Sequence, residues 1–339
     1  MPIPHLDCAA WLRRLPSGPG PCLALYSTAW GGIVTDPRLM QIPLDDHMVH
    51  RGDAVFEAFR CIAGAFYNLD AHLTRLQESA AEIRLRPPLP RARLLAALRA
   101  AVRAGGRRNC VVRVFFSRGP GSFSVNPRDC PAPQAYIAVA PTPPSAMARH
   151  PGGVRLKTCS FQFQPVFQAG LKSCNYLPSA MMQLEAVTAG ADYAAGFDSR
   201  GRLAEGATEN IGIITRDKRL LFPPSGGILE GTTMRRVLAL AGALTAHGRL
   251  KAAGRAPITR AAFDRAAEII VCGTSTEVAA AVSVDGRPVG DGRPGPAFRL
   301  LYDSLQRDMY HNVALRAPVW PQPARTRRSP QPQPLEAVS

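Results

Sequence analysis

The chain has 339 residues, of which 46% are hydrophobic, and its 41 Lys and Arg against 25 Asp and Glu give a formal net charge of +16. This length allows two domains that each bury a core, and no apolar run of about eighteen residues predicts a membrane-spanning helix. The arginines are scattered, with no basic helix and no aromatic interleaving, so we expect neither a nucleic-acid partner nor a membrane partner.

The beginning of the chain lacks the features of a targeting signal. Residues 1–21 form an N-terminal extension in which Pro2, Pro4 and Asp7 precede any apolar stretch, so the expected compartment is the cytoplasm. The 8 cysteines include no CxxC pair and no histidine stands at zinc-ligand spacing. We therefore expect structural thiols and no metal site.

Residues 22–145 are predicted to form a small α+β domain. Two segments rich in aromatic and apolar residues are typical of strands, and Ala63-Gly64 breaks the second as a hairpin would. A helix follows, with Asp70 as its cap and Pro87 and Pro88 as its stop. The strands are expected over 22–30, 53–69, 110–116 and 134–140, and a second helix over 91–104.

The stretch 140–153, APTPPSAMARHPGG, concentrates Pro and Gly and is typical of an interdomain connection. Beyond it, residues 152–312 are predicted to form a larger domain in which strands and helices alternate. Residues 319–339 are rich in Pro, Gln and Arg, which predicts a disordered tail. The strands are expected over 154–161, 192–197, 208–215 and 268–272, and the helices over 178–189, 232–246 and about 295–310.

Only four lysines are present, which shortens the search for a nucleophilic amine. Lys218 and Lys251 lie in polar turns and Lys157 lies on a predicted strand. Lys172 differs, because LKSCNYLPSAMM places it between an apolar region and a helix, with Ser, Asn and Tyr close by. Burial there would lower its pKa and free the amine to form an imine. Taken alone, such a lysine is more often a solvated charge with a packed stem.

Three further segments carry polar groups at suitable positions. RLAEGATENIGII places Glu205 beside a tight turn, and GILEGTTMRR places two threonines at the start of an amphipathic helix, where the backbone N–H groups and the helix dipole attract anions. VCGTSTEV ends a strand in a turn whose backbone can hold phosphate or carboxylate. Each has an ordinary alternative: Thr232 as a helix cap, Gly273 as a simple turn, Glu205 as a surface carboxylate.

Together these segments resemble the class IV pyridoxal-phosphate aminotransferases, which include branched-chain aminotransferase, D-amino-acid transaminase and aminodeoxychorismate lyase. The resemblance runs from about Leu23 to Met309 through HRGDAVFEAFRC, NLDAHLTRL, KSCNYL, EGATENIG, LEGTT and CGTSTEV, in the family's order. It implies a two-domain α+β fold of type IV, with a small N-terminal α/β domain and a larger C-terminal domain around a β-barrel-like core. It also implies a homodimer, with the cofactor in the cleft between the domains.

The resemblance implies that Lys172 holds pyridoxal 5′-phosphate as a Schiff base and, once released, moves the proton between the substrate Cα and the cofactor C4′. Glu205 would face the pyridine nitrogen and keep it protonated, and Tyr176 would bond the 3′ oxygen. An Arg fork and hydroxyl groups would bind the phosphate. The remaining implied cofactor-binding residues are Arg75, Asn210, Leu229, Gly231, Thr232, Thr233 and Thr274.

The KSCNYL segment is more similar to transaminases than to lyases. We therefore expect transfer of an amino group between an amino acid, branched-chain-like or D-amino acid, and a 2-keto acid such as 2-oxoglutarate or pyruvate. The alternatives are a lyase of the aminodeoxychorismate type, because the two reactions share their early chemistry, and a basic nucleic-acid-binding module on a catalytic fold.

The substrate carboxylate needs its own ligand. Bacterial D-amino-acid transaminases use an Arg and a His two residues apart, and at the matching places this chain has Phe123 and Val125. Phe56 would form part of the side-chain pocket, because alternate strand positions project to one face. The candidates for the carboxylate are Arg60, Arg113 or Arg118, and the backbone amides of Thr274 and Ser275.

Overall fold

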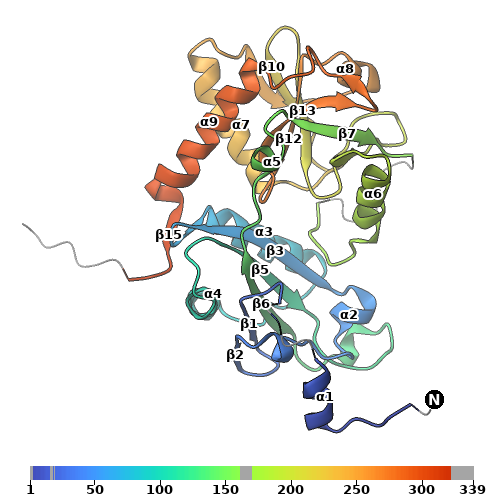
Figure 1. Ribbon diagram of the computed structural model, residues 1–339, viewed down its shortest axis with the longest axis vertical. Coiled ribbons are helices and arrows are strands. Elements are labelled where there is room, and N and C mark those ends of the chain that lie inside the picture. The colour runs from blue at the N-terminus through green and yellow to red at the C-terminus, as the bar shows by residue number, and fades with distance from the viewer. Residues whose placement is uncertain (1–2, 16–17, 19, 161–169, 322–339) are drawn as a thin grey trace, which may run out of the picture.

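The computed structural model describes residues 3–15, 18, 20–160 and 170–321. Each half of the molecule is built around one sheet, and Figure 1 shows the two halves stacked along the long axis, with the N-terminal half below. The two-domain α+β fold predicted from the sequence is confirmed.

The small domain contains a seven-stranded sheet in the order β15-β4-β3-β5-β6-β1-β2, and every neighbouring pair is antiparallel. Two helices, α3 (Leu69–Glu82) and α4 (Arg91–Ala104), pack against this sheet. The strands are β1 (Ala24–Ser27), β2 (Gly32–Val34), β3 (Ala54–Ile62), β4 (Ala65–Tyr67), β5 (Cys110–Ser117), β6 (Gln134–Pro141) and β15 (Arg316–Pro318).

Strand β3 alternates between two environments, as a strand with two different faces should. Val55, Glu57 and Phe59 are fully buried, and their side is the one that α3 covers. Phe56 and the next two alternate residues are only half-buried, on the side where the large domain approaches. The sequence therefore presents one face of β3 to the junction between the domains.

The large domain contains a mixed sheet in the order β11-β10-β9-β12-β13-β7-β8, with β14 paired to β13. In the described part of the chain the end strands β11 and β8 do not pair, so the barrel-like core is an open sheet. The strands are β7 (Val154–Thr158), β8 (Tyr193–Ala195), β9 (Asn210–Ile214), β10 (Arg219–Phe222), β11 (Ala252–Arg255), β12 (Glu268–Gly273), β13 (Glu277–Val284) and β14 (Arg287–Pro288).

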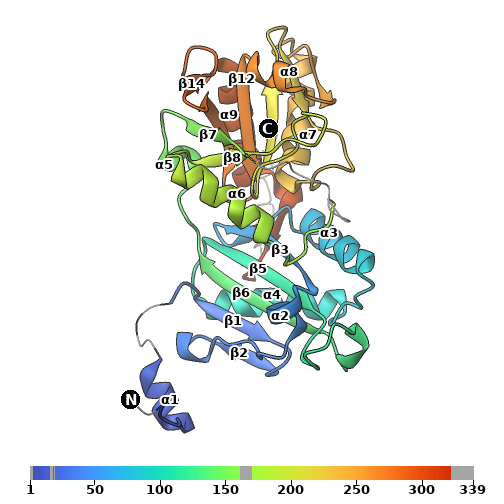
Figure 2. The ribbon, with the colours of Figure 1, turned by 90° about the vertical axis from the view of Figure 1, so that its right-hand side faces the viewer.

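Helices cover this second sheet and complete its core. α7 and α9 pack on each other and on β12, and Val237, Leu301 and Ile270 belong to the same buried core. α6 packs against β7 and β8, and Figure 2 shows it in front of the junction between the two halves. The helices are α5 (Ala146–Arg149), α6 (Leu177–Thr188), α7 (Thr232–Ala246), α8 (Arg260–Asp264) and α9 (Pro296–His311).

Short helices complete the described elements: α1 (Cys8–Arg14), η1 (Pro37–Leu39), α2 (His47–Arg51), η2 (Pro127–Asp129) and η3 (Val313–Leu315). Among the residues that the structure describes, no helix has both the length and the apolar character needed to cross a membrane.

Most elements predicted from periodicity are present within a few residues, but the start of α3 differs. Its N-cap is Asn68, in a left-handed conformation and without a side-chain bond, and Asp70 lies inside the first turn. The helix also ends at Glu82, before the two prolines. The sequence analysis missed α1, α2, α5 and α8 and the strands β2, β10, β11, β13, β14 and β15, most of which are short or rich in Ala, Gly and Arg.

The chain returns to the small domain at its C-terminal end. Figure 1 shows α9 leading down to β15, which pairs with β4. Val319 is fully buried in the small-domain core, and its N–H donates to the carbonyl of Gly64 at 3.0 Å. The sequence predicts a disordered tail from residue 319, but Val319 is ordered and buried. Residues 322–339 of that tail, and residue 161 of a predicted strand, lie outside the described residues.

Candidate active site

The backbone of Lys172 is fixed by the small domain, although the residue belongs to the large one. The N–H of Phe56 donates to the carbonyl of Lys172 at 2.9 Å, and the N–H of Cys174 donates to the carbonyl of Ala54 at 2.9 Å. The N–H of Lys172 also donates to Ser79 Oγ on α3 at 3.3 Å. These bonds make residues 172–174 a short continuation of the small-domain sheet, at the junction of the two domains.

The Lys172 side chain is buried among aromatic groups. Its Nζ lies 2.8 Å from the hydroxyl of Tyr176 and 4.6 Å from the centre of the Phe56 ring. Burial, and then the positive charge of Arg75, lower the pKa of Lys172 from 10.5 to about 8. The amine therefore has a substantial neutral fraction near neutral pH, which is the form that attacks a carbonyl.

An aromatic wall lines the small-domain side of this site. Phe56 stacks on Phe115 at 5.6 Å between ring centres and meets Tyr176 edge-on at 5.1 Å. On the same face of the sheet, Ala58 stands opposite Arg113 in the pairing of β3 with β5. Arg113 is exposed, and its side chain makes no hydrogen bond or ion pair within the described ranges, so its guanidinium is available to an anion.

Glu205 is oriented by two donors from its surroundings. Its Oε2 accepts from the N–H of Leu229 at 3.0 Å and, more weakly, from Asn210 Nδ2 at 3.4 Å. Asn210 Nδ2 also donates to the carbonyl of Leu229 at 2.9 Å, so these three residues form one unit. Burial raises the pKa of Glu205 from 4.5 to about 8, despite the Leu229 N–H and the Lys172 charge.

The N-terminus of α7 has donors to offer to an anion. Its N-cap is Gly231, which supplies no side-chain bond, so Thr232 is the first helical residue and not the cap. The first N–H groups of a helix have no intrahelical partner, and the helix dipole adds positive potential there. The Thr232 hydroxyl lies 3.2 Å from His72 Nε2 on α3. This end of α7 therefore faces the small domain with backbone N–H groups that can donate to an anion.

Arg75 reaches the same place from α3. Its Nε and Nη2 donate to the two carboxylate oxygens of Glu57 at 2.5 and 2.9 Å, and its Nη1 donates to the carbonyl of Glu230 at 2.9 Å. Three of its five N–H groups are used, which leaves two for a ligand. Burial raises the pKa of Glu57, but Arg75 and His72 outweigh it and hold that pKa at about 2.

Glu57 and His72 belong to the same candidate site through their hydrogen bonds, and the sequence analysis missed both. Glu57 is fully buried and also accepts from His72 Nδ1 at 2.6 Å. The network Thr232–His72–Glu57–Arg75 thus links the start of α7 to the underside of β3. In the sequence, the only sign of this network is the acidic residue Glu57 at an inward-facing position of a strand. No partner for it stands out in the neighbouring sequence.

The 274–276 turn joins β12 to β13, which pair Gly273 with Glu277. Thr274 is half-buried and Ser275 is exposed. A Cβ on Gly273 would lie 3.7 Å from Glu209 Cγ, so the turn rests on the loop that carries Glu205. The structure therefore places this turn beside the Glu205 loop.

Two of the arginines considered for the substrate carboxylate are already paired. Arg118 binds both oxygens of Asp53 at 2.9 Å, and it also donates to the carbonyl of Ile83. Arg60 forms an ion pair with Glu277, and its side chain is 11% exposed. Of the three arginines, Arg113 alone remains open within the described residues.

A family model described as "Amino-transferase class IV" matches residues 54–284. The D-amino-acid transaminase of Arabidopsis thaliana chloroplasts is 35% identical over 297 residues, which are 87% of this chain and 79% of that protein. A branched-chain-amino-acid aminotransferase of Pseudomonas aeruginosa is 32% identical over 265 residues, 75% of this chain and 83% of that protein.

The fold is also that of a solved relative. The T.th. branched-chain amino acid aminotransferase, in complex with pyridoxamine 5′-phosphate, superposes with a TM-score of 0.80 at 27% sequence identity. The match covers 88% of this chain and 99% of that one.

Proposed function

The chain belongs to the class IV aminotransferases, whose cofactor is pyridoxal 5′-phosphate, and we propose that it moves an amino group from a D-amino acid to a 2-keto acid. The observation that carries the proposal is the buried Lys172 amine, held 2.8 Å from the Tyr176 hydroxyl and facing Phe56. The D configuration is supported by the name of the relative that is 35% identical over 87% of this chain.

The residues present fit this cofactor. A Cβ on Gly231 would lie 1.8 Å from Asn210 Oδ1, so only glycine leaves the backbone of the 229–231 segment this close to the Glu205 loop. The uncapped start of α7 and the two free N–H groups of Arg75 suit a phosphate, and Glu205 suits a protonated pyridine nitrogen. When bound, the cofactor supplies an electron sink for charge that develops at the substrate Cα.

The remaining steps, proton transfer and the orientation of the reacting groups, are assigned to side chains of the protein. The Lys172 amine, with a pKa near 8, can accept the proton that leaves the substrate Cα and then donate it to another carbon of the reacting molecule. The Tyr176 hydroxyl holds Nζ in place, and Leu229 and Asn210 orient the Glu205 carboxylate, which would face the ring nitrogen of the bound cofactor. Because the site is buried between two domains, water is largely excluded and these electrostatic contacts are strong.

Recognition of the substrate carboxylate is assigned in the same proposal to Arg113 and to the backbone of the 274–275 segment. Arg113 lies beside the aromatic wall of Phe56 and Phe115 and carries no competing partner in the described residues. An apolar substrate side chain would contact the rings while a carboxylate reaches the guanidinium.

The test is a titration of the purified enzyme with L- and D-amino acids, followed by its visible absorbance, with Lys172→Ala as control. D-alanine should convert the cofactor to its amine form, and a 2-keto acid should reverse the conversion. If only L-leucine, L-isoleucine and L-valine act, the branched-chain reaction replaces the proposal. If no amino acid acts and aminodeoxychorismate yields pyruvate, a lyase does.

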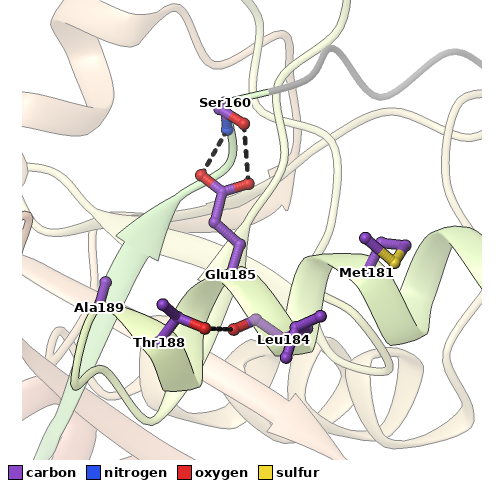
Figure 3. Close-up of a pocket in the computed structure, with 6 residues that line it drawn as sticks. All are labelled: Ser160, Met181, Leu184, Glu185, Thr188 and Ala189. Atoms are coloured by element: carbon purple, nitrogen blue, oxygen red, sulfur yellow. Dashed lines mark hydrogen bonds between the residues drawn. The ribbon is translucent and has the colours of Figure 1, made fainter.

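We also propose that the chain forms a homodimer through the outer face of α6. Four large apolar side chains there are 47–73% exposed, and their spacing places them on one side of the helix. Figure 3 shows that Met181 and Leu184 line a pocket together with Glu185, whose carboxylate reaches Ser160 through two hydrogen bonds of 2.8 and 3.0 Å. The four residues are Leu177, Met181, Leu184 and Val187.

Two further exposed apolar side chains lie in the small domain, on a segment that polar contacts link to the start of α6. Asn175 Nδ2, just before α6, donates to the carbonyl of Gly52 at 3.2 Å, and Arg51 donates to the carbonyl of Phe123. Phe123 and Val125 are 61% and 80% exposed. Large apolar side chains that gather on a surface mark interaction sites, and a second copy seated on α6 would border the active site.

Analytical ultracentrifugation tests the dimer. Leu184→Arg should turn a dimer into monomers, whereas Leu6→Arg, at a 40% exposed leucine of the N-terminal extension, should not. A wild-type protein that sediments as a monomer at micromolar concentration would contradict this assignment.

A further inference from the structure

Glu277 holds an unusual backbone conformation at the end of the 274–276 turn. Its φ is 61°, in the left-handed region that residues other than glycine rarely adopt. A hairpin with three loop residues commonly places glycine at this kind of position. The side chain of Glu277 must therefore be held by contacts that offset the strain.

Two side chains supply those contacts, one from each domain. Arg60 Nη1, on β3, donates to Glu277 Oε1, and Gln306 Nε2, on α9, donates to Oε2 at 2.5 Å. The side chains of Arg60 and Glu277 are only 11% and 6% exposed, so the ion pair is largely removed from water. Both carboxylate oxygens of Glu277 accept a hydrogen bond, so the carboxylate is held in one orientation.

The same contacts change the role of Arg60. Its Nε is buried and has no hydrogen-bond partner within the described ranges, and its charge is balanced by Glu277. To bind a substrate carboxylate, Arg60 would have to abandon a buried carboxylate whose backbone is already strained. Breaking a buried ion pair from one side is strongly unfavourable, because it leaves the other charge uncompensated.

We propose that Arg60 is a positioning residue: through Glu277 it holds the 274–276 turn in the shape in which the backbone of the turn binds an anion. The anion is the cofactor phosphate or the substrate carboxylate, and both present the same oxygen acceptors to backbone N–H groups. The inference rests on the proposed function for the identity of that anion, and on the ion pair and the turn for the role of Arg60.

A double-mutant cycle separates positioning from direct binding. Arg60→Met leaves the buried Glu277 without a counter-charge, and Glu277→Gly does the same to the buried Arg60, so each single change should weaken anion binding at least tenfold. The double variant removes both charges and puts glycine where φ is positive. It should recover binding to within about threefold of the wild-type value.

Three measurements identify the anion. The dissociation constant of the apoenzyme is determined for pyridoxal phosphate and for pyridoxal, which lacks the phosphate, and KM is determined for the amino acid. A loss confined to pyridoxal phosphate assigns the turn to the phosphate, and a loss confined to KM assigns it to the carboxylate. The cofactor arm needs no turnover, so it remains informative if the proposed reaction is wrong.

Tyr67→Phe is the matched control. Tyr67 joins the small domain to Asp308 of α9 at 2.5 Å and does not touch the turn, so its loss should leave both dissociation constants unchanged. If the single variants do not fold, the double variant alone decides. Recovery of cofactor affinity and KM in the double variant supports positioning. If Arg60→Met causes the same loss in the wild-type protein and in the Glu277→Gly variant, Arg60 is itself the ligand and the proposal is overturned.

Discussion

Replacing Gly231 with alanine should weaken both the Glu205 unit and the binding of phosphate at the start of α7. The backbone of Gly231 has a φ of −60°, which alanine accepts, so conformational strain is not the cause. The added Cβ would lie 1.8 Å from Asn210 Oδ1, and one of the two groups must move. Asn210 is only 5% exposed and cannot turn into water.

The size of the effect follows from the bonds that Asn210 makes. Moving its amide breaks the bond to the Leu229 carbonyl at 2.9 Å and the weaker one to Glu205 at 3.4 Å. At about 1 kcal/mol for each bond, the free energy of unfolding of the apoenzyme should fall by about 2 kcal/mol. A loss of that size at the cofactor site corresponds to about a 30-fold weaker affinity for pyridoxal phosphate.

Urea denaturation and a fluorescence titration with pyridoxal phosphate measure the two effects. Gly242→Ala is the control on the same helix, because a Cβ there meets nothing within 4 Å. It should raise the free energy of unfolding by about 0.5–1 kcal/mol, since alanine is the better helix former, and leave cofactor affinity unchanged. A Gly231→Ala enzyme with wild-type stability and affinity would refute the reasoning.

Three further outcomes are expected. Glu57→Gln should cost about 3 kcal/mol of unfolding free energy at pH 7 by urea denaturation. That gap should close as pH falls from 4.5 toward 2, because the pKa of Glu57 lies near 2 in the folded state. Amine labelling of the apoenzyme, mapped by peptide, should show a phase with a midpoint near pH 8 that Lys172→Ala lacks, since the pKa of Lys172 is about 8. Tyr176→Phe should lower kcat about tenfold in a transamination assay, the equivalent of one lost hydrogen bond.

The sequence was most informative where function depends on residues close together in the chain. Lys172 and Tyr176 are four residues apart, and the start of α6 brings their side chains within hydrogen-bond distance. Likewise, the run from Glu205 to Asn210 forms a turn whose ends meet. Strand β3 follows the same logic, because alternation alone separates Phe56, on the cleft side, from Glu57, beneath the helix.

The ends of the helices were harder to predict from the sequence, for a physical reason. Asp70 is a good capping residue, yet the backbone at Asn68 adopts a left-handed conformation and α3 begins at Leu69. The N–H of Asn68 donates to the carbonyl of Leu315 at 2.7 Å, so a contact with a distant segment holds the residue before the helix. Thr232 behaves in the same way, because the close approach of Asn210 requires glycine at the preceding position.

Arg60 shows where reasoning from the sequence ends. An arginine on the cleft face of a strand, two positions from an alanine and four from an aromatic residue, is what a carboxylate ligand would look like. Its partner Glu277 stands 217 residues later in the chain, and the positive φ of that partner is visible only in three dimensions. A charged side chain is free to bind a substrate only if no opposite charge elsewhere in the fold is already paired with it. The distinction between a binding arginine and a positioning arginine therefore lies in the long-range pairing. Arg113 has no such pairing in the described residues, and for that reason we propose it as the ligand of the substrate carboxylate.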